Sequence, residues 1–157
     1  MLDKNNKLWV LSDGGYQGDA NKVVPALTRI DAETFSVEKV FSFSSSQFAP
    51  SRLKINGTLD TLYFLSGSWV KLNNAVSGVI RMPVNADALT DEPLIPENSR
   101  LFYGLGIDPV NSDIYVTDAI DYQQPGWVYR YNRAGGIVDS FKTDIIPGCF
   151  CFKGAPN

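Results

Sequence analysis

The sequence contains no histidine, and this absence removes a large class of enzyme mechanisms. Without an imidazole base, a Ser-His-Asp triad or a Cys-His pair cannot form. The sequence also lacks a P-loop, a G-x-G-x-x-G motif and a nucleophile elbow. We therefore expect a protein that is not an enzyme.

The chain is also poor in charge clusters and in long apolar runs. Its 157 residues are 44% hydrophobic and 20% charged, with a formal net charge of −3 and no basic or acidic run. A single soluble domain without a nucleic-acid partner is therefore expected. The apolar runs are far shorter than the roughly 20 residues of a membrane span. Met1 is followed by "LDKNNK" rather than an apolar signal segment, so the chain alone predicts a cytoplasmic protein.

Cysteine is scarce, with only Cys149 and Cys151, in "PGCFCFKG". Two positions apart on one strand, their Cα atoms would lie about 6.6 Å from each other, which disfavours a disulfide. With no histidine and no second cysteine pair, one subunit cannot supply four zinc ligands. We predict free thiols that are buried on a strand and react slowly, and no cofactor or metal.

What the sequence does contain is an internal repeat. The apolar runs "LWVLS", "LYFLS" and "IYVTD" begin at Leu8, Leu62 and Ile114, at intervals of roughly 50 residues. Each predicts a strand buried on both faces. Three arginine-bearing strands recur at the same interval, and they contain Arg29, Arg81 and Arg130. Because these arginines occupy equivalent positions, we interpret them as structural, making contacts between repeats.

Each repeat predicts four antiparallel strands. An inner strand ("SRLKI", "YGLGI") leads through a turn to the apolar strand, and a long polar loop precedes the arginine strand and an outer strand. Such a unit is a propeller blade. We expect an all-β fold, a β-propeller with about three four-stranded antiparallel blades in one module over 1–157. The repeats cover approximately 1–49, 50–101 and 102–148, and 149–157 form a terminal inner strand.

The repeat resembles a known family. "IYVTD", with "GIDPVN" before it and "VYRYN" after it, is similar to the YVTN-type β-propeller family. The pattern "LWVLSDGG…ALTRIDAETFSVEKVF" and the ending "IPGCFCFK" resemble the C-terminal blades of surface-layer propeller lipoproteins of gut bacteria. The resemblance implies a cell-surface or outer-membrane location. Some members of that group bind cobalamin or related corrinoids and pass them to an outer-membrane transporter, which would be a partner here.

Three blades are too few to close a propeller ring. Met1 falls where Ile55 stands in the second repeat, so the first repeat is expected to lack its inner strand. We predict a partial propeller, or a half-ring closed by a homodimer in which residues 150–152 of each copy occupy the place before Leu8 of the other. The end faces that such a dimer would bury are expected to carry Trp9, Leu11, Tyr115 and Val116.

In a four-stranded blade, the long loops and the loops between blades open on one face, which is the usual ligand face of a propeller. Aromatic rings beside amide groups on this face suit a small molecule such as a corrinoid or a glycan. The candidate ligand-binding residues are Tyr16, Gln17, Trp69, Lys71, Asn73, Tyr103, Tyr122 and Gln123. The loops between blades also supply Gln47, Phe48, Ser51, Arg52, Arg100 and Phe102.

Other interpretations remain open from the sequence. The aromatic side chains of this face could instead pin the long loops onto the blades. The module could be a protein-protein interaction scaffold whose loop face docks another protein, or a truncated propeller fragment without independent activity.

Overall fold

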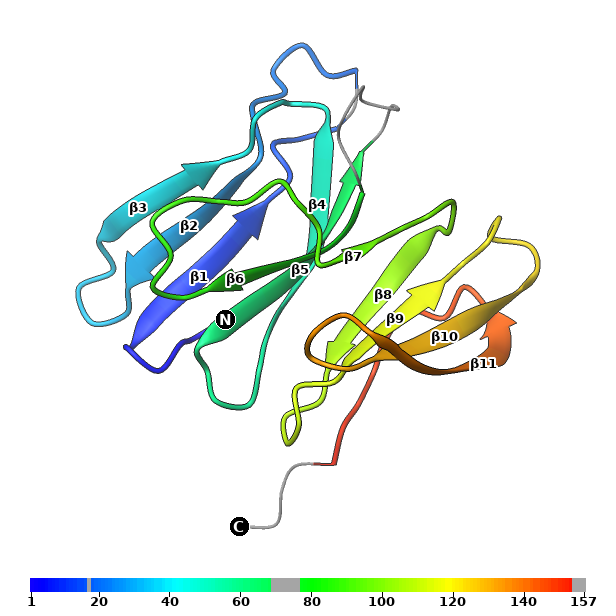
Figure 1. The fold of residues 1–157 in the computed structure, drawn as a ribbon. Helices are drawn as coiled ribbons and strands as arrows, with labels where there is room; N and C mark the ends of the chain where they lie inside the picture. The colour runs from blue at the N-terminus through cyan, green and yellow to red at the C-terminus, as the bar shows by residue number, and fades with distance from the viewer. Residues whose placement is uncertain (17, 69–76, 154–157) are drawn as a thin grey trace.

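The computed structural model describes residues 1–16, 18–68 and 77–153, and within these ranges it contains strands and no α-helix. No helix in the described part is therefore long and apolar enough to span a membrane. The strands form three antiparallel sheets of three, four and four strands (Figure 1). The prediction of an all-β fold with repeated antiparallel sheets is confirmed, and the described residues show three sheets rather than a closed ring.

The strands follow the repeats in chain order. The first sheet contains β1 (Lys7–Ser12), β2 (Ala26–Asp31) and β3 (Val37–Ser42). The second contains β4 (Phe48–Ile55), β5 (Thr61–Ser68), β6 (Gly78–Pro83) and the short β7 (Ile95–Pro96). The third contains β8 (Phe102–Ile107), β9 (Ile114–Asp118), β10 (Pro125–Tyr131) and β11 (Ile137–Ile145).

The first sheet lacks a fourth strand, as expected. Residues 1–3 turn back beside β1 and form only a short antiparallel pairing, with an isolated bridge between Leu2 and Leu8. The Met1 amino group donates to the Trp9 carbonyl at 2.8 Å, and the Trp9 amide donates to the Met1 carbonyl at 2.7 Å. The inner edge of β1 beyond this pairing has no neighbouring strand among the described residues.

Two hydrophobic clusters join the sheets, and both use the alternation of β5. Leu62 and Phe64 pack in the cluster shared with the first sheet, while Tyr63 and Leu65 pack in the cluster shared with the third. All four side chains are buried, so the prediction of a strand buried on both faces is confirmed for β5. Alternate side chains of β5 thus face the preceding sheet and the following sheet.

The expected composition of the end faces is partly wrong. Trp9 is 1% exposed, packing between the first and second sheets, and Val116 is fully buried between the second and third. The outward side of the first sheet instead carries Val10, 42% exposed, and Val40, 54% exposed. β1 is therefore not buried on both faces. We call Leu8, Val10, Ile30 and Val40, which the register places on one side, the first-sheet end face.

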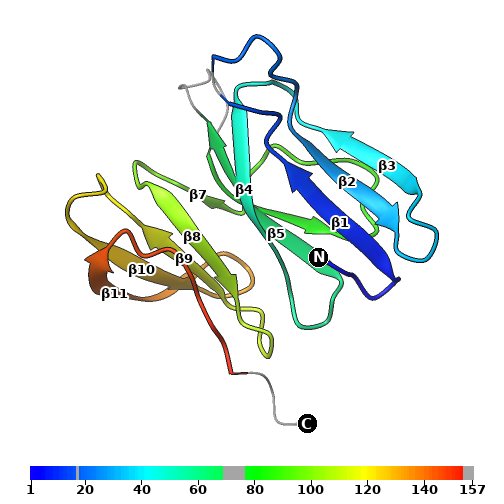
Figure 2. The ribbon, with the colours of Figure 1, turned by 180° about the vertical axis from the view of Figure 1, so that it is seen from behind.

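Tyr115 does lie on an end face, which the register assigns to Gly106, Tyr115, Thr117 and Val128. This third-sheet end face is covered by residues 147–152, the C-terminal segment (Figure 2). Phe150 and Phe152 pack on Tyr115 with ring centroids 5.8 and 5.3 Å away. A Cβ at Gly106 would lie 2.8 Å or less from three atoms of the Phe150 side chain, so the glycine makes room for this ring.

The C-terminal segment corrects the prediction for the cysteines. Cys149 and Cys151 are free, as predicted, but both are exposed and neither belongs to a strand. The alternation that directs Phe150 and Phe152 onto Tyr115 turns the two thiols outward. In this structure the two phenylalanines contact their own third sheet, whereas the predicted dimer places them beside Leu8 of a second copy.

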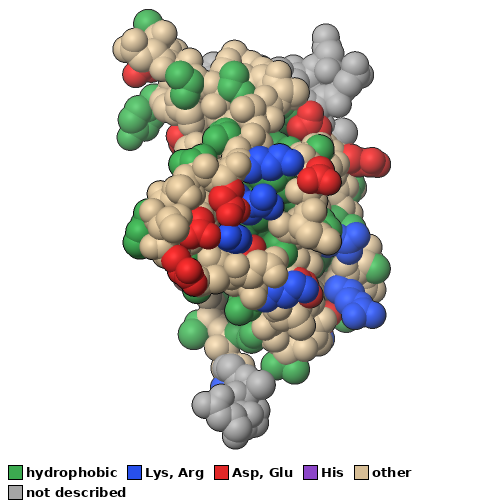
Figure 3. All heavy atoms as spheres, turned by 90° about the vertical axis from the view of Figure 1, so that its left-hand side faces the viewer, with side chains coloured by type: hydrophobic (Ala, Val, Ile, Leu, Met, Phe, Trp, Pro, Cys, Tyr) green, Lys and Arg blue, Asp and Glu red, His purple; other side chains and the backbone are tan. Residues whose placement is uncertain are grey.

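The repeated arginines are anchored in different ways. Arg29 donates to Glu38 at 3.0 Å, and Arg130 lies 2.6 Å from Asp113, in both cases within one sheet. Only Arg81 makes the expected contact between repeats, donating to the Arg133 carbonyl at 3.0 Å. Figure 3, which shows the molecule from the β3 side, displays the basic and acidic side chains of this surface interleaved.

Candidate functional site

A cleft of about 360 Å³ lies where the second and third sheets meet, at the ends of the strands that lead into the long loops. We call it the tyrosine cleft. Its walls come from the residue after β1, from β4 and β5, from the connection between β7 and β8, from the start of β8, and from the loop after β9. It is lined by Asp13, Ala49, Pro50, Ser51, Arg52, Leu65, Gly67, Glu97, Leu101, Phe102, Tyr103 and Tyr122.

The two tyrosines of the cleft contact each other directly. Tyr103 lies on β8 and Tyr122 on the loop between β9 and β10, with ring centroids 5.8 Å apart and planes at 83°. This edge-to-face arrangement is favourable for aromatic pairs. The Tyr122 backbone has a positive φ of 63° and its amide donates to the Ala119 carbonyl at 2.9 Å. The loop is thus tightly turned, yet the Tyr122 side chain remains 48% exposed.

Arg52 brings a positive charge to the same pair of rings. Its guanidinium carbon lies 5.0 Å from the centroid of the Tyr103 ring, and its Nε donates to the Tyr103 carbonyl at 2.9 Å. The pairing of β4 with β5 shifts register between Ser51 and Lys54, and Arg52 has a positive φ of 60° within this irregularity. The β-bulge therefore re-aims Arg52 toward the third sheet.

An acidic group lies on another wall of the cleft. The Glu97 carboxylate accepts a hydrogen bond from the Phe102 amide at 3.1 Å. Partial burial raises the pKa of Glu97, and the nearby negative charge of Asp118 raises it further, although the Phe102 hydrogen bond acts in the opposite direction. The cleft thus combines aromatic edges, a guanidinium and a carboxylate, which can stack on and hydrogen-bond a small polar molecule.

The described residues contain no group of three or more His, Cys, Asp and Glu side chains arranged to hold a metal ion.

Four of the eight candidate residues can be placed. Tyr103 and Tyr122 line the tyrosine cleft together. Tyr16 is 86% exposed and does not line it, and Gln123 is exposed, with its backbone N–H donating to the Asp121 carboxylate at 2.9 Å. The other four lie outside the described residues, namely Gln17, Trp69, Lys71 and Asn73.

Sequence reasoning missed Glu97, which follows the two-residue β7. The second repeat shows no alternating outer strand comparable with "SVEKVFSF" of the first, so no pattern indicated where the chain returns to the loop face. By contrast, Ser51, Arg52 and Phe102 were expected on this face from their place between repeats, and all three line the cleft.

No protein-family model matches the chain, and no curated protein matches it. Among solved structures, the chain is similar to Kuenenia stuttgartiensis hydrazine synthase, with a TM-score of 0.57 and 11% sequence identity. The similarity covers 94% of this chain and 50% of that chain, so the chain spans half the length of this structural neighbour. At this level of identity, the similarity describes the fold alone.

Proposed function

We propose that this chain is a non-catalytic binding module of a surface-layer-type β-propeller, and that its tyrosine cleft captures a small molecule such as a corrinoid or a glycan. A location at the cell surface or outer membrane and delivery to an outer-membrane transporter belong to the same proposal. They rest on the resemblance of the repeat and of the C-terminal sequence to surface-layer propeller lipoproteins.

The observation that carries the proposal is the Tyr103–Tyr122 pair with Arg52 beside it. A partly exposed aromatic pair offers a stacking surface, and a guanidinium and a carboxylate on neighbouring walls can fix the orientation of a polar ligand. The cleft volume of about 360 Å³ lies at the lower end of small-molecule sites. This size suits one or two sugar rings, or one edge of a corrinoid.

A protein-protein interaction scaffold is the second candidate, and the first-sheet end face favours it. Val10 and Val40 are exposed on either side of Thr28, on the same face of the sheet as the half-buried Leu8 and Ile30, and such a largely apolar face can pack against another sheet. The sequence alone predicts a scaffold that docks through its loop face, whereas the exposed valines favour docking through the first-sheet end face. Variants of this face and of the tyrosine cleft therefore separate the two functions.

Calorimetric titration with cobalamin, cobinamide and a panel of neutral oligosaccharides tests the proposal. At least one of these ligands should bind saturably, and Tyr122→Ala and Tyr103→Ala should each weaken it by about tenfold through lost stacking. Tyr16→Ala is the matched control, because that ring is exposed and lies outside the lining of the cleft. Affinity that is unchanged by both cleft variants, or equally reduced by Tyr16→Ala, would contradict the proposal.

A further inference from the structure

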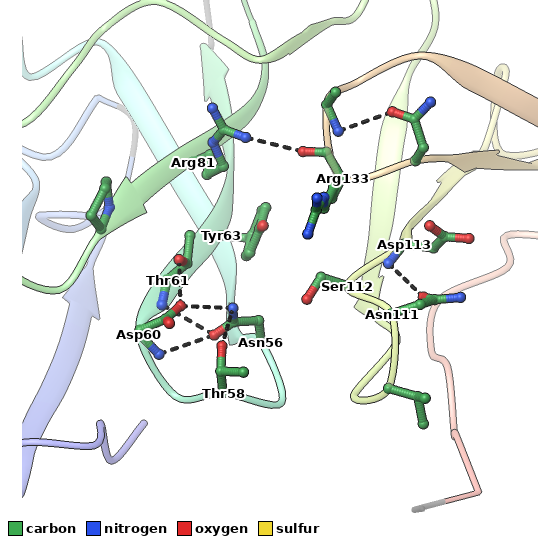
Figure 4. A pocket seen from close by; sticks show the side chains of 14 residues that line it. Asn56, Thr58, Asp60, Thr61, Tyr63, Arg81, Asn111, Ser112, Asp113 and Arg133 are labelled. Carbon is green, nitrogen blue, oxygen red and sulfur yellow. Dashed lines mark hydrogen bonds between the residues drawn. The ribbon is translucent and has the colours of Figure 1, made fainter.

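A second and larger cavity of about 950 Å³ lies between the second and third sheets at the opposite ends of their strands. We call it the turn pocket. Its walls come from the turn between β4 and β5, the end of β6, the turn between β8 and β9, and the turn between β10 and β11 (Figure 4). The side chains that matter for its chemistry are Thr58, Tyr63, Arg81, Ser112 and Arg133.

The two turns that form one end of the turn pocket touch each other. A Cβ at Gly57 would collide with the carbonyl oxygen of Pro109, so only glycine permits this approach of the β4–β5 turn to the β8–β9 turn. The β4–β5 turn is also internally fixed, because the buried Asn56 side chain donates to Thr58 at 2.8 Å and to Asp60 at 2.9 Å. The pocket therefore has preformed walls.

The acidic side chains of the turn pocket are already engaged. Asp60 accepts hydrogen bonds from Asn56 and from the Thr61 hydroxyl, and these bonds hold its pKa below the ordinary value. Asp113 is paired with Arg130 at 2.6 Å. Neither carboxylate is paired with Arg81 or Arg133, and these two arginines make no ion pair among the described residues.

Arg81 differs from the arginines at the equivalent positions of the other two repeats, because it forms no ion pair among the described residues. At the equivalent positions of the other sheets, Arg29 is held by Glu38 and Arg130 by Asp113. In the second sheet the residue equivalent to Asp113 is Thr61, which carries no charge. Arg81 instead donates to the Arg133 carbonyl, which fixes its guanidinium at the wall of the pocket next to the second arginine (Figure 4). Two positive charges thus share one cavity without an acidic partner.

Hydroxyl groups accompany the two arginines. Thr58 and Ser112 line the pocket from the two touching turns, and the Tyr63 ring is buried with its side chain directed into the same space (Figure 4). No hydrogen bond joins the Tyr63 hydroxyl to another described residue, and burial raises its pKa, so this hydroxyl keeps its proton at neutral pH. It can therefore donate to a ligand.

We propose that the turn pocket is a second binding site, separate from the tyrosine cleft, for a saccharide that bears a negatively charged group. Arg81 and Arg133 receive the carboxylate or phosphate, since guanidinium groups suit both through paired N–H donors. The Thr58, Tyr63 and Ser112 hydroxyls bond the hydroxyls of the sugar ring. A sugar acid and a sugar phosphate share this chemistry, and their separate titrations distinguish them.

The test is a titration of the ¹⁵N-labelled protein with glucuronate, glucose 6-phosphate, glucose and inorganic phosphate. At least one charged sugar should shift the amide signals of Ser112 and Arg133, and it should bind at least about tenfold more tightly than glucose or inorganic phosphate. The affinity should fall as the salt concentration rises. Tighter binding of glucuronate identifies a carboxylated ligand, and tighter binding of glucose 6-phosphate identifies a phosphorylated one.

Variants locate the site. Arg81→Gln and Arg133→Gln should each weaken binding at least about tenfold, since a hydrogen bond to a charged group is lost. Both arginines are exposed, so both variants should fold, as circular dichroism can verify. Arg29→Gln is the matched control at the equivalent repeat position, and Tyr122→Ala should leave this binding unchanged while it weakens binding at the tyrosine cleft.

Three results would overturn the proposal. The first is that glucose binds as tightly as both charged sugars. The second is that neither charged sugar binds. The third is that both arginine variants bind the charged sugar as tightly as the unmodified protein does. Each of these can occur whether or not the tyrosine cleft binds a corrinoid or a glycan, so the two proposals fail separately.

Discussion

The two end faces of the stack of sheets have the same origin in the repeat but different surroundings. On the first-sheet end face, Val10 and Val40 are 42% and 54% exposed, whereas Val128 on the third-sheet end face is 5% exposed. The third sheet is covered by the C-terminal segment, and nothing among the described residues covers the first. A short irregular segment is therefore sufficient to bury the end face of the third sheet, while the first-sheet end face keeps exposed apolar side chains.

The inner strands explain why the C-terminal segment fits the third sheet. β8 carries Gly104 and Gly106 on the covered side, where the second repeat has Arg52 and Lys54 at the equivalent positions. Added Cβ atoms would clash with the Gly148 carbonyl at Gly104 and with Phe150 at Gly106. The Thr117 hydroxyl also donates to the Pro147 carbonyl at 2.5 Å. Local sequence thus distinguishes a strand that accepts a covering segment from one that supplies the arginine of the tyrosine cleft.

Truncation after Ile146 would remove the C-terminal segment and leave both end faces uncovered. It should have the largest effect on stability. Loss of the Phe150 and Phe152 contacts with Tyr115 should lower the free energy of unfolding by about 3 kcal/mol or more. Urea denaturation followed by tryptophan fluorescence measures the change. Phe35→Ala, at a side chain that is 74% exposed, is the control and should change stability little. A truncated protein as stable as the full chain would show that the segment does not support the third sheet.

Gly106→Ala tests whether the C-terminal segment packs closely on β8, because it adds one methyl group beneath Phe150. The added methyl group would overlap the Phe150 ring, so we expect a loss of about 1–3 kcal/mol. The same substitution in a Phe150→Ala background should cost much less, because the ring that causes the overlap is absent. Additive losses in this double-mutant cycle would locate the strain elsewhere.

Val40→Glu tests the first-sheet end face, which no described residue covers. Because Val40 is 54% exposed, the change should alter stability by no more than about 0.5 kcal/mol. It should nevertheless reduce self-association, since a charge would replace an apolar contact. Light scattering of the unmodified protein should give twice the chain mass of 17.3 kDa if the predicted homodimer forms, and Val40→Glu should shift it toward one chain. A monomeric unmodified protein at high concentration would rule out the homodimer.

The smallest expected effect is a difference in pH response between the first sheet and the junction of the second and third sheets. The Lys7 contact at 2.6 Å lowers the pKa of Asp31 below its ordinary value of 3.8. Asp31 therefore stabilises the first sheet above pH 3.8, and this contribution is lost as the pH falls toward its lowered pKa. The pKa of Glu97 is raised above 4.5 mainly by burial, so its ionisation costs stability as the pH rises through that raised value.

Hydrogen exchange at pH 7 and at pH 3 can separate these two responses. Acidification should lower the protection of β1–β3 relative to β8–β9. Glu97→Gln should raise stability slightly at pH 7, and the gain should disappear below pH 4.5, where the Glu97 carboxyl is protonated. An equal loss of protection in both sheets would contradict this assignment.

The sequence predicted the strands well but not the direction in which their faces point. Alternation in "LWVLS" shows that Trp9 and Val10 lie on opposite sides, yet a period of two does not say which side meets the next sheet. Trp9 was therefore expected on an end face, whereas it packs against Phe41 at a centroid distance of 5.7 Å. The packing of the first sheet against the second determines which side of β1 is buried.

Position in the repeat was sufficient to predict that Tyr103 and Tyr122 lie on one face, and their role in ligand binding stays a prediction. Tyr103 and Tyr122 follow from the rule that long loops and inter-repeat loops share a face, and they meet in one cleft. The path of the C-terminal segment depends on glycines that are distant in sequence, so "CFCF" was wrongly interpreted as a buried strand. The sequence likewise does not show that Arg81 lacks an acidic partner among the described residues, because this depends on which side chains lie near it in the folded structure.

The central claim is that a ligand binds where the second and third sheets meet at the loop face. Amide chemical-shift mapping with the tightest corrinoid or oligosaccharide from the titrations tests it most directly. The account predicts that the largest shifts fall on Arg52, Tyr103 and Tyr122, with none on the first-sheet end face. Shifts centred on Val10 and Val40, with the three cleft residues unchanged, would contradict it.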